Sequence, residues 1–296
     1  MVFSMQKLAR RWLPLCCLFL IGACQATSPP VKQMSASAQL TIDGQKTNRV
    51  IPLQIEHTGK RWVAVQETMN ALDLRMQQAG ETYQIGYTDP IYTVKAGDIS
   101  ATVGDRRIML PRAPRAQNDQ LFMTVEALSA LLNTEIKWDA NKRKLSLVAP
   151  TLLSTDEGQK SASIQSSGNV NGAEVIRFAE RFLGTPYEFG ADDYRETKAF
   201  DCSSFVKYVL ERFGVEVPRS SIEQASVGRR ISADQFKPGD LLFFFTPGRY
   251  ASNRMVGHVA MYAGNGEIIH TYGDPGVTKS ELAGYWEQRL LFAKRP

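Results

Sequence analysis

Short runs of alternating apolar and polar residues dominate residues 39–149 of the chain. Turn residues such as Gly, Asp and Asn separate the runs, and this combination predicts β-strands joined by tight turns. The clearest runs cover residues 38–42, 50–55 and 62–65. We therefore expect residues 39–149 to form a first domain that is rich in strands.

The first domain contains two similar halves. Moving the sequence by 60 positions lays residues 62–65 over residues 122–125, and residues 71–74 over residues 131–134. In each half a strand leads into a helix of about ten residues and then into further strands. We therefore expect an internal duplication and a small α+β domain.

The pattern changes in residues 173–296. Apolar residues recur three or four positions apart over residues 173–183 and again from Cys202 onward, which predicts two helices, with Asp201 as N-cap of the second. Apolar strands follow over residues 240–245, 258–263 and 267–272. Helices followed by antiparallel strands predict an α+β fold for this second domain.

Polar segments and an N-terminal apolar run complete the organisation. Residues 24–38 and 150–172 are rich in small and polar residues, which is typical of a tether and a flexible linker. Three positive charges precede the apolar run 12–23, which is shorter than the roughly 20 residues of a membrane span. Residues 1–23 therefore have the pattern of a signal peptide.

The run ends in Gly22-Ala23-Cys24, which resembles a bacterial lipobox. The resemblance implies a lipid on Cys24 and a protein anchored to a membrane rather than spanning it, and an ordinary signal peptide is the alternative. The formal net charge of +5 falls to +2 without the three positive charges of residues 1–23. No basic stripe for nucleic acid then remains, so we expect no nucleic-acid partner.

Cysteine usage directs attention to Cys202. Of four cysteines, Cys16 and Cys17 lie in the signal peptide and Cys24 would carry lipid, which leaves one thiol in an exported protein. A lone thiol in an oxidising compartment is a liability unless it has a function. The start of a helix favours a thiolate. Cys202 is therefore a candidate nucleophile, with an inert buried cysteine as the alternative.

A thiol nucleophile needs a base and a group that orients the base. The second domain has two histidines, His258 and His270, on strands joined by Gly264-Asn265-Gly266. A two-residue turn would place the histidines on opposite faces, whereas a three-residue loop would place both on one face. We predict the three-residue loop, with His258 opposite Tyr272 and His270 opposite Ala260.

A zinc site of one cysteine and two histidines is the competing chemistry at these residues. No second cysteine or carboxylate has ligand spacing in this domain, and structural zinc sites usually need four ligands. We therefore expect no metal and no cofactor.

Ordered motifs in the second domain resemble those of the NlpC/P60 family. They are Gly184-Thr185-Pro186-Tyr187, Phe200-Asp201-Cys202-Ser203-Ser204-Phe205, Pro218-Arg219-Ser220-Ser221, Lys237-Pro238-Gly239-Asp240, Gly257-His258-Val259-Ala260 and Ile268-Ile269-His270. The resemblance implies a papain-like cysteine peptidase of bacterial cell walls. Its typical members cut peptidoglycan stem peptides between γ-D-glutamate and a diamino acid.

The resemblance also implies roles for individual residues. Cys202 would attack the carbonyl, His258 would act as general base and acid, and His270 would orient His258. Tyr187 would help to stabilise the oxyanion, unless it merely fills space. Asp201, Ser203, Ser221 and Arg219 match substrate-side positions, where a helix cap or a turn is the alternative role.

The first domain is similar to the stalk domain related to the N-terminal domain of copper amine oxidases. The similarity lies in Val125-Glu126-Ala127-Leu128 and Ile136-Lys137-Trp138-Asp139. It implies no copper here, because His57 is the only histidine of the segment. A spacer or a wall-binding module is the expected role.

Together these features predict an extracytoplasmic, lipid-anchored peptidoglycan hydrolase that faces the cell wall. Two alternatives stay open. The papain-like fold could act as an amidase or acyltransferase, because other nucleophiles can intercept its thioester. The protein could also be a wall-binding lipoprotein without catalysis.

Overall fold

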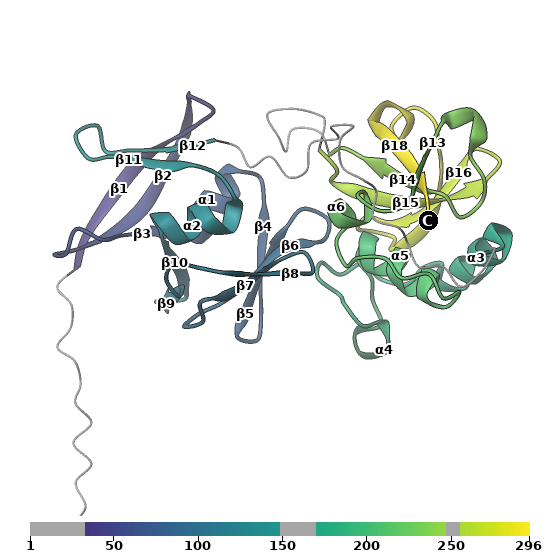
Figure 1. The fold of residues 1–296 in the computed structure, drawn as a ribbon, viewed down its shortest axis with the longest axis horizontal. Coiled ribbons are helices and arrows are strands. Elements are labelled where there is room, and N and C mark those ends of the chain that lie inside the picture. Colours follow the sequence, from purple (N-terminus) through teal and green to yellow (C-terminus); the bar gives the residue numbers. More distant parts are fainter. Residues whose placement is uncertain (1–32, 149–169, 247–254) are drawn as a thin grey trace, which may run out of the picture. The chain divides into compact units, whose positions relative to one another are not determined.

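The computed structural model describes residues 33–148, 170–246 and 255–296 (Figure 1). The expected signal peptide, Cys24 and nearly all of the expected linker lie outside these residues. Among the helices described, none is long and apolar enough to cross a membrane.

The first domain contains a seven-stranded sheet with the order β11-β12-β1-β2-β3-β10-β9. Its strands are β1 (Gln33–Ile42), β2 (Gln45–Glu56), β3 (Arg61–Ala64), β9 (Arg115–Gln117), β10 (Gln120–Thr124), β11 (Ile136–Asp139) and β12 (Lys144–Leu147). The expected tether 24–38 is wrong at its end, because β1 already begins at Gln33. Gln33 pairs with Glu56 of the long strand β2, so backbone pairing extends the sheet where the side chains show no apolar period.

A second sheet of five antiparallel strands follows the chain order from β4 to β8. Its strands are β4 (Arg75–Ala79), β5 (Thr82–Gly86), β6 (Pro90–Lys95), β7 (Ser100–Val103) and β8 (Arg106–Met109). Between β5 and β6 lies a short loop, residues 87–89.

The two halves of the first domain share one arrangement, as the duplication predicts. Strand β3 runs into α1 (Val65–Ala71), and β10 runs into α2 (Val125–Leu132). A hairpin follows each helix, β4–β5 in the first half and β11–β12 in the second. Strands β3 and β10 pair antiparallel, with Met123 opposite Val63, so the two strand–helix units meet beside the edge strand β9.

The second domain packs helices against a six-stranded sheet, which confirms the α+β prediction (Figure 1). The helices are α3 (Gly172–Ala179), α4 (Tyr194–Thr197), α5 (Cys202–Glu211) and α6 (Ser221–Gln224). The sheet has the order β13-β18-β14-β15-β16-β17. Its strands are β13 (Arg229–Ile231), β14 (Leu241–Phe244), β15 (His258–Gly264), β16 (Glu267–Thr271), β17 (Val277–Glu281) and β18 (Leu290–Arg295).

Helix α5 lies at the centre of this domain and contacts β15 and β16. Its apolar side chains are fully buried, with Phe205, Val206 and Val209 each at 0% exposure. Burying a side chain of this kind stabilises a fold by about 1.5–3 kcal/mol. The burial of this face therefore fixes α5 on the sheet and holds its first turn at the edge of the strands.

The β15–β16 hairpin combines a correct register with an unexpected turn. Met261 pairs with Ile269 and Tyr262 with Ile268, which is the register predicted from a three-residue loop. The loop prediction itself is wrong, because the register shifts after Tyr262 and the chain reverses in a two-residue turn, Asn265-Gly266. Both turn residues have positive φ, 52° and 75°, which Asn-Gly accommodates well. A bulge at Ala263 supplies the extra residue.

Candidate functional site

Helix α5 begins at Cys202 because Asp201 caps it, as predicted. The Asp201 carboxylate accepts a hydrogen bond from the Ser204 N–H at 2.8 Å, and the Ser204 hydroxyl accepts one from the Asp201 N–H at 3.0 Å. This reciprocal pair forms a capping box, with serine in the place of the usual glutamate. The Cys202 side chain is fully buried in the first turn of the helix.

The two histidines lie on one face of the hairpin and contact each other. Nε2 of His258 lies 3.1 Å from Nδ1 of His270, which confirms that both rings share a face. Nε2 of His270 lies 3.0 Å from the hydroxyl of Ser280 on β17. Nδ1 of His258 is buried and has no hydrogen-bond partner among the residues that the structure describes. One nitrogen of His258 is therefore available to another group.

Aromatic rings enclose both histidines. The Trp286 ring centroid lies 5.2 Å from that of His258 and 4.6 Å from that of His270. The ring centroid of Phe244, on β14, lies 5.9 Å from that of His258. Sequence reasoning missed Trp286, because a tryptophan in a turn region carries no pattern that links it to a hairpin.

Burial also sets the protonation of the site. It raises the pKa of the Cys202 thiol well above its usual value, and the carboxylates of Asp89 and Asp201 raise it further. Burial lowers the pKa of His258 well below its usual value, and it lowers the pKa of His270 to about 4. In this structure the site therefore holds a neutral thiol and neutral imidazoles.

Cys202 lies next to the start of β15. A hydrogen bond from the backbone of Val259, the residue after His258, opposes the rise of the Cys202 pKa, and α5 packs directly on β15. Tyr187 forms an isolated β-bridge with Phe200, two residues before Cys202. The fold thus gathers Cys202, His258, His270 and Tyr187 in one place.

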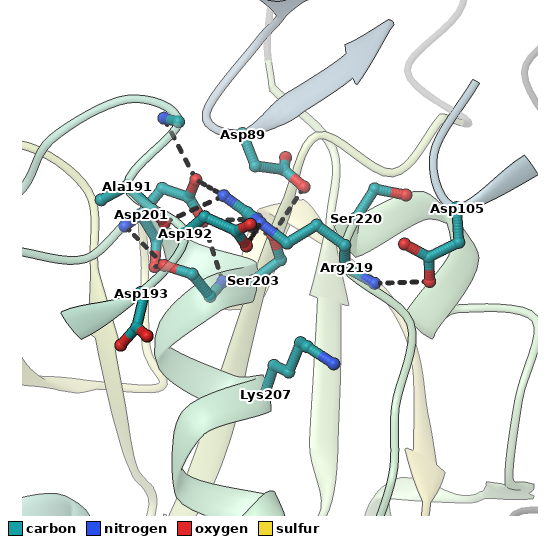
Figure 2. Close-up of polar contacts among 12 residues, drawn as sticks. Asp89, Asp105, Ala191, Asp192, Asp193, Asp201, Ser203, Lys207, Arg219 and Ser220 are labelled. Carbon is teal, nitrogen blue, oxygen red and sulfur yellow. Dashed lines mark hydrogen bonds and ion pairs between the residues drawn. The ribbon is translucent and has the colours of Figure 1, made fainter. Parts of the chain in front are cut away.

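Arg219 forms a partly buried ionic cluster at the start of α5 (Figure 2). Its guanidinium donates to the carboxylate of Asp201 at 2.5 Å and to Asp192 at 2.8 Å. It also donates to the Ser203 hydroxyl at 2.9 Å. Burial alone would lower the pKa of Arg219, but the surrounding carboxylates raise it above its usual value. Arg219 therefore stays charged and holds the capping aspartate in place.

Ser203 and Ser221 both donate hydrogen bonds to a carboxylate of the first domain. The backbone N–H and the hydroxyl of Ser221 donate to Asp89 at 2.6 and 2.9 Å, and the Ser203 hydroxyl donates to Asp89 at 2.8 Å. Burial, helped by the Asp201 charge, raises the pKa of Asp89 to about 6. Sequence reasoning missed Asp89, because residues 87–89 have the pattern of an ordinary turn in another domain.

Within residues 33–148, 170–246 and 255–296, no group of three or more His, Cys, Asp or Glu side chains could hold a metal ion. The arrangement of one thiol and two linked imidazoles fits nucleophilic chemistry.

Comparison with known protein families matches both domains. Residues 184–295 match the NlpC/P60 family, and residues 41–147 match the copper amine oxidase N-terminal domain. The crystal structure of the NlpC/p60 domain of the peptidoglycan hydrolase SagA is 35% identical, covers 43% of this chain and all of that one, and has a TM-score of 0.35.

Two curated relatives differ in how much of them the chain spans. Gamma-DL-glutamyl hydrolase of Bacillus subtilis is 34% identical over 123 residues, which is 41% of this chain but 28% of that protein. Probable endopeptidase NlpC of Escherichia coli is 38% identical over 114 residues, which is 38% of this chain and 70% of that protein. On this similarity, the chain belongs to the NlpC/P60 family.

Proposed function

We propose that this protein is a cysteine peptidase that hydrolyses peptidoglycan stem peptides at the bond between γ-D-glutamate and a diamino acid. The observation that carries the proposal is the 3.1 Å contact between His258 and His270 on the two strands that pack against the helix of the buried thiol Cys202. The names of the relatives, an endopeptidase and a γ-DL-glutamyl hydrolase, support the reaction class.

The two contacts allow a set of proton positions that suits a general base. In this set Nε2–H of His270 donates to the Ser280 hydroxyl, and Nδ1 of His270 accepts from Nε2–H of His258. Nδ1 of His258 then carries a lone pair and is the atom without a partner. His258 can therefore take the proton of Cys202 as the thiolate attacks, and return it to the leaving amine.

Two further sets of residues would bind the reacting substrate. The hydroxyl of Tyr187 and the backbone N–H of Cys202 would donate to the oxyanion. A γ-linked glutamate keeps its α-carboxylate free, and Ser203 and Ser221 already bind a carboxylate in this structure. These two serines would therefore select the acidic residue on the acyl side of the bond.

The proposal includes a place in the cell. Residues 1–23 would direct export, Cys24 would carry a lipid, and the following residues would tether the protein to the membrane surface. The first domain would act as a spacer or wall-binding module, and residues 150–172 would link it to the peptidase domain. This organisation would place the enzyme outside the cytoplasm and facing the wall.

Synthetic tripeptides L-Ala-γ-D-Glu-L-Lys and L-Ala-γ-D-Glu-diaminopimelate test the reaction. We expect the full chain to release L-Ala-D-Glu from at least one of them, as read by mass spectrometry, and we expect Cys202→Ala to release none. His57→Ala, which changes an exposed histidine of the first domain, is the control. Equal release by Cys202→Ala would contradict the thiol mechanism. Release of whole peptides from the lactyl ether of muropeptides would indicate an amidase instead.

A further inference from the structure

The β5–β6 loop of the first domain presents two residues, Thr88 and Asp89, to the catalytic site. On either side of them Tyr87 and Ile91 are buried, at 3% and 4% exposure. A side chain on Gly86 would clash with the Asp89 carbonyl, so the turn is tight and needs glycine. The loop is therefore anchored by the core of its own domain, with Thr88 and Asp89 at its tip.

Thr88 occupies the position in front of the nucleophile. Its hydroxyl oxygen lies 3.1 Å from Sγ of Cys202 and donates to the carbonyl of Gly257 at 2.5 Å. A reacting carbonyl must come within about 3–3.5 Å of the attacking atom. The Thr88 hydroxyl takes that place, so substrate cannot reach the thiol in this state.

The backbone of Thr88 also engages the expected oxyanion donor. The Tyr187 hydroxyl donates to the Thr88 carbonyl at 2.9 Å. A peptide carbonyl of the first domain thus accepts the hydrogen bond that Tyr187 would give to a substrate. Burial in this contact, together with the nearby Cys202, raises the pKa of Tyr187 above its usual value.

Asp89 fills the carboxylate pocket. Three donors from Ser203 and Ser221 hold it at 2.6 to 2.9 Å, and it is 1% exposed. The Arg219 guanidinium also donates a hydrogen bond to the hydroxyl of Ser203 (Figure 2). The loop therefore places a carbonyl and a carboxylate where the proposed function requires those two groups of a substrate.

Other contacts hold the loop's domain in this position. The guanidinium of Arg75 lies over the Phe189 ring at 5.3 Å and donates to the Tyr187 hydroxyl at 3.3 Å. In the β7–β8 turn, the Asp105 N–H donates to Glu223 at 3.0 Å, and the Asp105 carboxylate accepts from the Arg219 N–H at 3.1 Å (Figure 2). The occupancy of the site is therefore part of a wider interface.

We propose that Thr88 and Asp89 act as a built-in substrate mimic that closes the catalytic cleft, and that a ligand with a free carboxylate must displace them before catalysis. The identity of that ligand as a γ-D-glutamyl peptide rests on the proposed function. The closure of the cleft follows only from the contacts that Thr88 and Asp89 make with the second domain. The neutral thiol and imidazoles of this state fit a closed cleft, because opening would admit water and remove the Asp89 charge from the thiol.

Alkylation of Cys202 by iodoacetamide tests the closed cleft without any substrate. The full chain is labelled, and the peptide that contains Cys202 is quantified by mass spectrometry, since other cysteines are present. We expect Asp89→Ala to raise the labelling rate by about tenfold or more, because hydrogen bonds to a charged group are lost from the closed state only. Arg75→Ala changes an exposed residue outside the loop and should raise the rate by a smaller factor. Asp98→Ala, an exposed aspartate that caps Ser100, should leave the rate unchanged.

Hydrolysis of the two tripeptides is measured on the same variants. Faster labelling and faster hydrolysis in Asp89→Ala and Arg75→Ala support the substrate mimic. Faster labelling with no hydrolysis in any variant supports the closed cleft and overturns the proposed function. Wild-type labelling and wild-type hydrolysis rates in both variants would overturn the mimic and leave the proposed function intact.

Discussion

The two sides of Cys202 are built in different ways. On the histidine side, His258, His270 and Ser280 come from three adjacent strands of one sheet, β15, β16 and β17. On the carboxylate side, Ser203 and Ser221 of the second domain meet Asp89 of the first domain. One domain thus supplies the proposed reaction chemistry, while the other domain decides whether the thiol can be reached.

The two sides also differ in electrostatics. Aromatic rings surround the histidine side, and burial lowers the pKa of both imidazoles. Charged groups surround the carboxylate side, where burial and then the Asp201 charge raise the pKa of Asp89 and Arg219 opposes that rise. An apolar setting keeps a base neutral and able to accept a proton, whereas a charged setting makes the binding of a further anion sensitive to its environment.

Among changes that keep the nucleophile, removing the orienting group should have the largest effect on activity. We expect His270→Ala to lower kcat for the tripeptide by roughly a thousandfold with little change in KM, because His258 loses the partner that fixes its tautomer. His270→Asn should restore part of kcat, since an amide oxygen can accept the same hydrogen bond. His57→Ala is the control. A kcat for His270→Ala within twofold of wild type would show that the histidine side works without its second ring.

Removing Arg219 should mainly affect stability. Its guanidinium pairs with the fully buried Asp201 carboxylate, so Arg219→Ala leaves that charge uncompensated and should lower the free energy of unfolding by about 3 kcal/mol. Arg195→Ala breaks an exposed pair with Asp193 and should cost less than about 1 kcal/mol. Urea unfolding followed by circular dichroism measures both. Equal losses would mean that the cluster does not hold the start of α5.

Acidity should tighten the closed state by a smaller factor. The pKa of Asp89 rises from 3.8 to about 6 when the loop is bound between Asp201 and Arg219. The extra stabilisation is therefore fully present below about pH 4 and is lost as pH rises through about 6. Asn does not titrate, so the closed state of Asp89→Asn should not weaken over this pH range. The ratio of wild-type to Asp89→Asn labelling at Cys202 should rise by about tenfold between pH 5 and 7.

A disulfide reagent such as 2,2′-dipyridyl disulfide allows this measurement across the range, because it reacts with thiols in acid. The ratio removes the common effect of thiol ionisation. A ratio that stays flat from pH 4.5 to 7.5 would contradict a carboxylate that titrates inside the pocket.

Patterns within one domain were predictable from the sequence. Apolar period and capping chemistry predicted a helix that begins at Cys202, and turn residues predicted the hairpin that carries His258 and His270. The exact loop was not predictable, because a bulge and a longer loop give the same register from the same residues. Strand β1 was also misjudged at its start, since pairing with β2 extends it through residues that have no apolar signal.

Contacts between the two domains could not be predicted from such patterns. Thr88 lies 114 residues before Cys202, and the local sequence of Thr88 and Asp89 indicates only a turn. Arg219 was placed near substrate by resemblance, whereas its hydrogen bonds tie it to the helix cap. Periodicity describes which face of an element is buried, but it does not identify the partner that buries it.

The bulge at Ala263 has a consequence for how this chain tolerates length changes. Side chains alternate between the faces of a sheet, so the meeting of His258 and His270 depends on the register of the two strands. Deleting one strand residue between His258 and Tyr262 would turn the His258 imidazole to the opposite face. Deleting Ala263 would instead remove the bulge and keep Tyr262 opposite Ile268. The bulge thus marks the point where this hairpin can lose one residue without separating the two imidazoles.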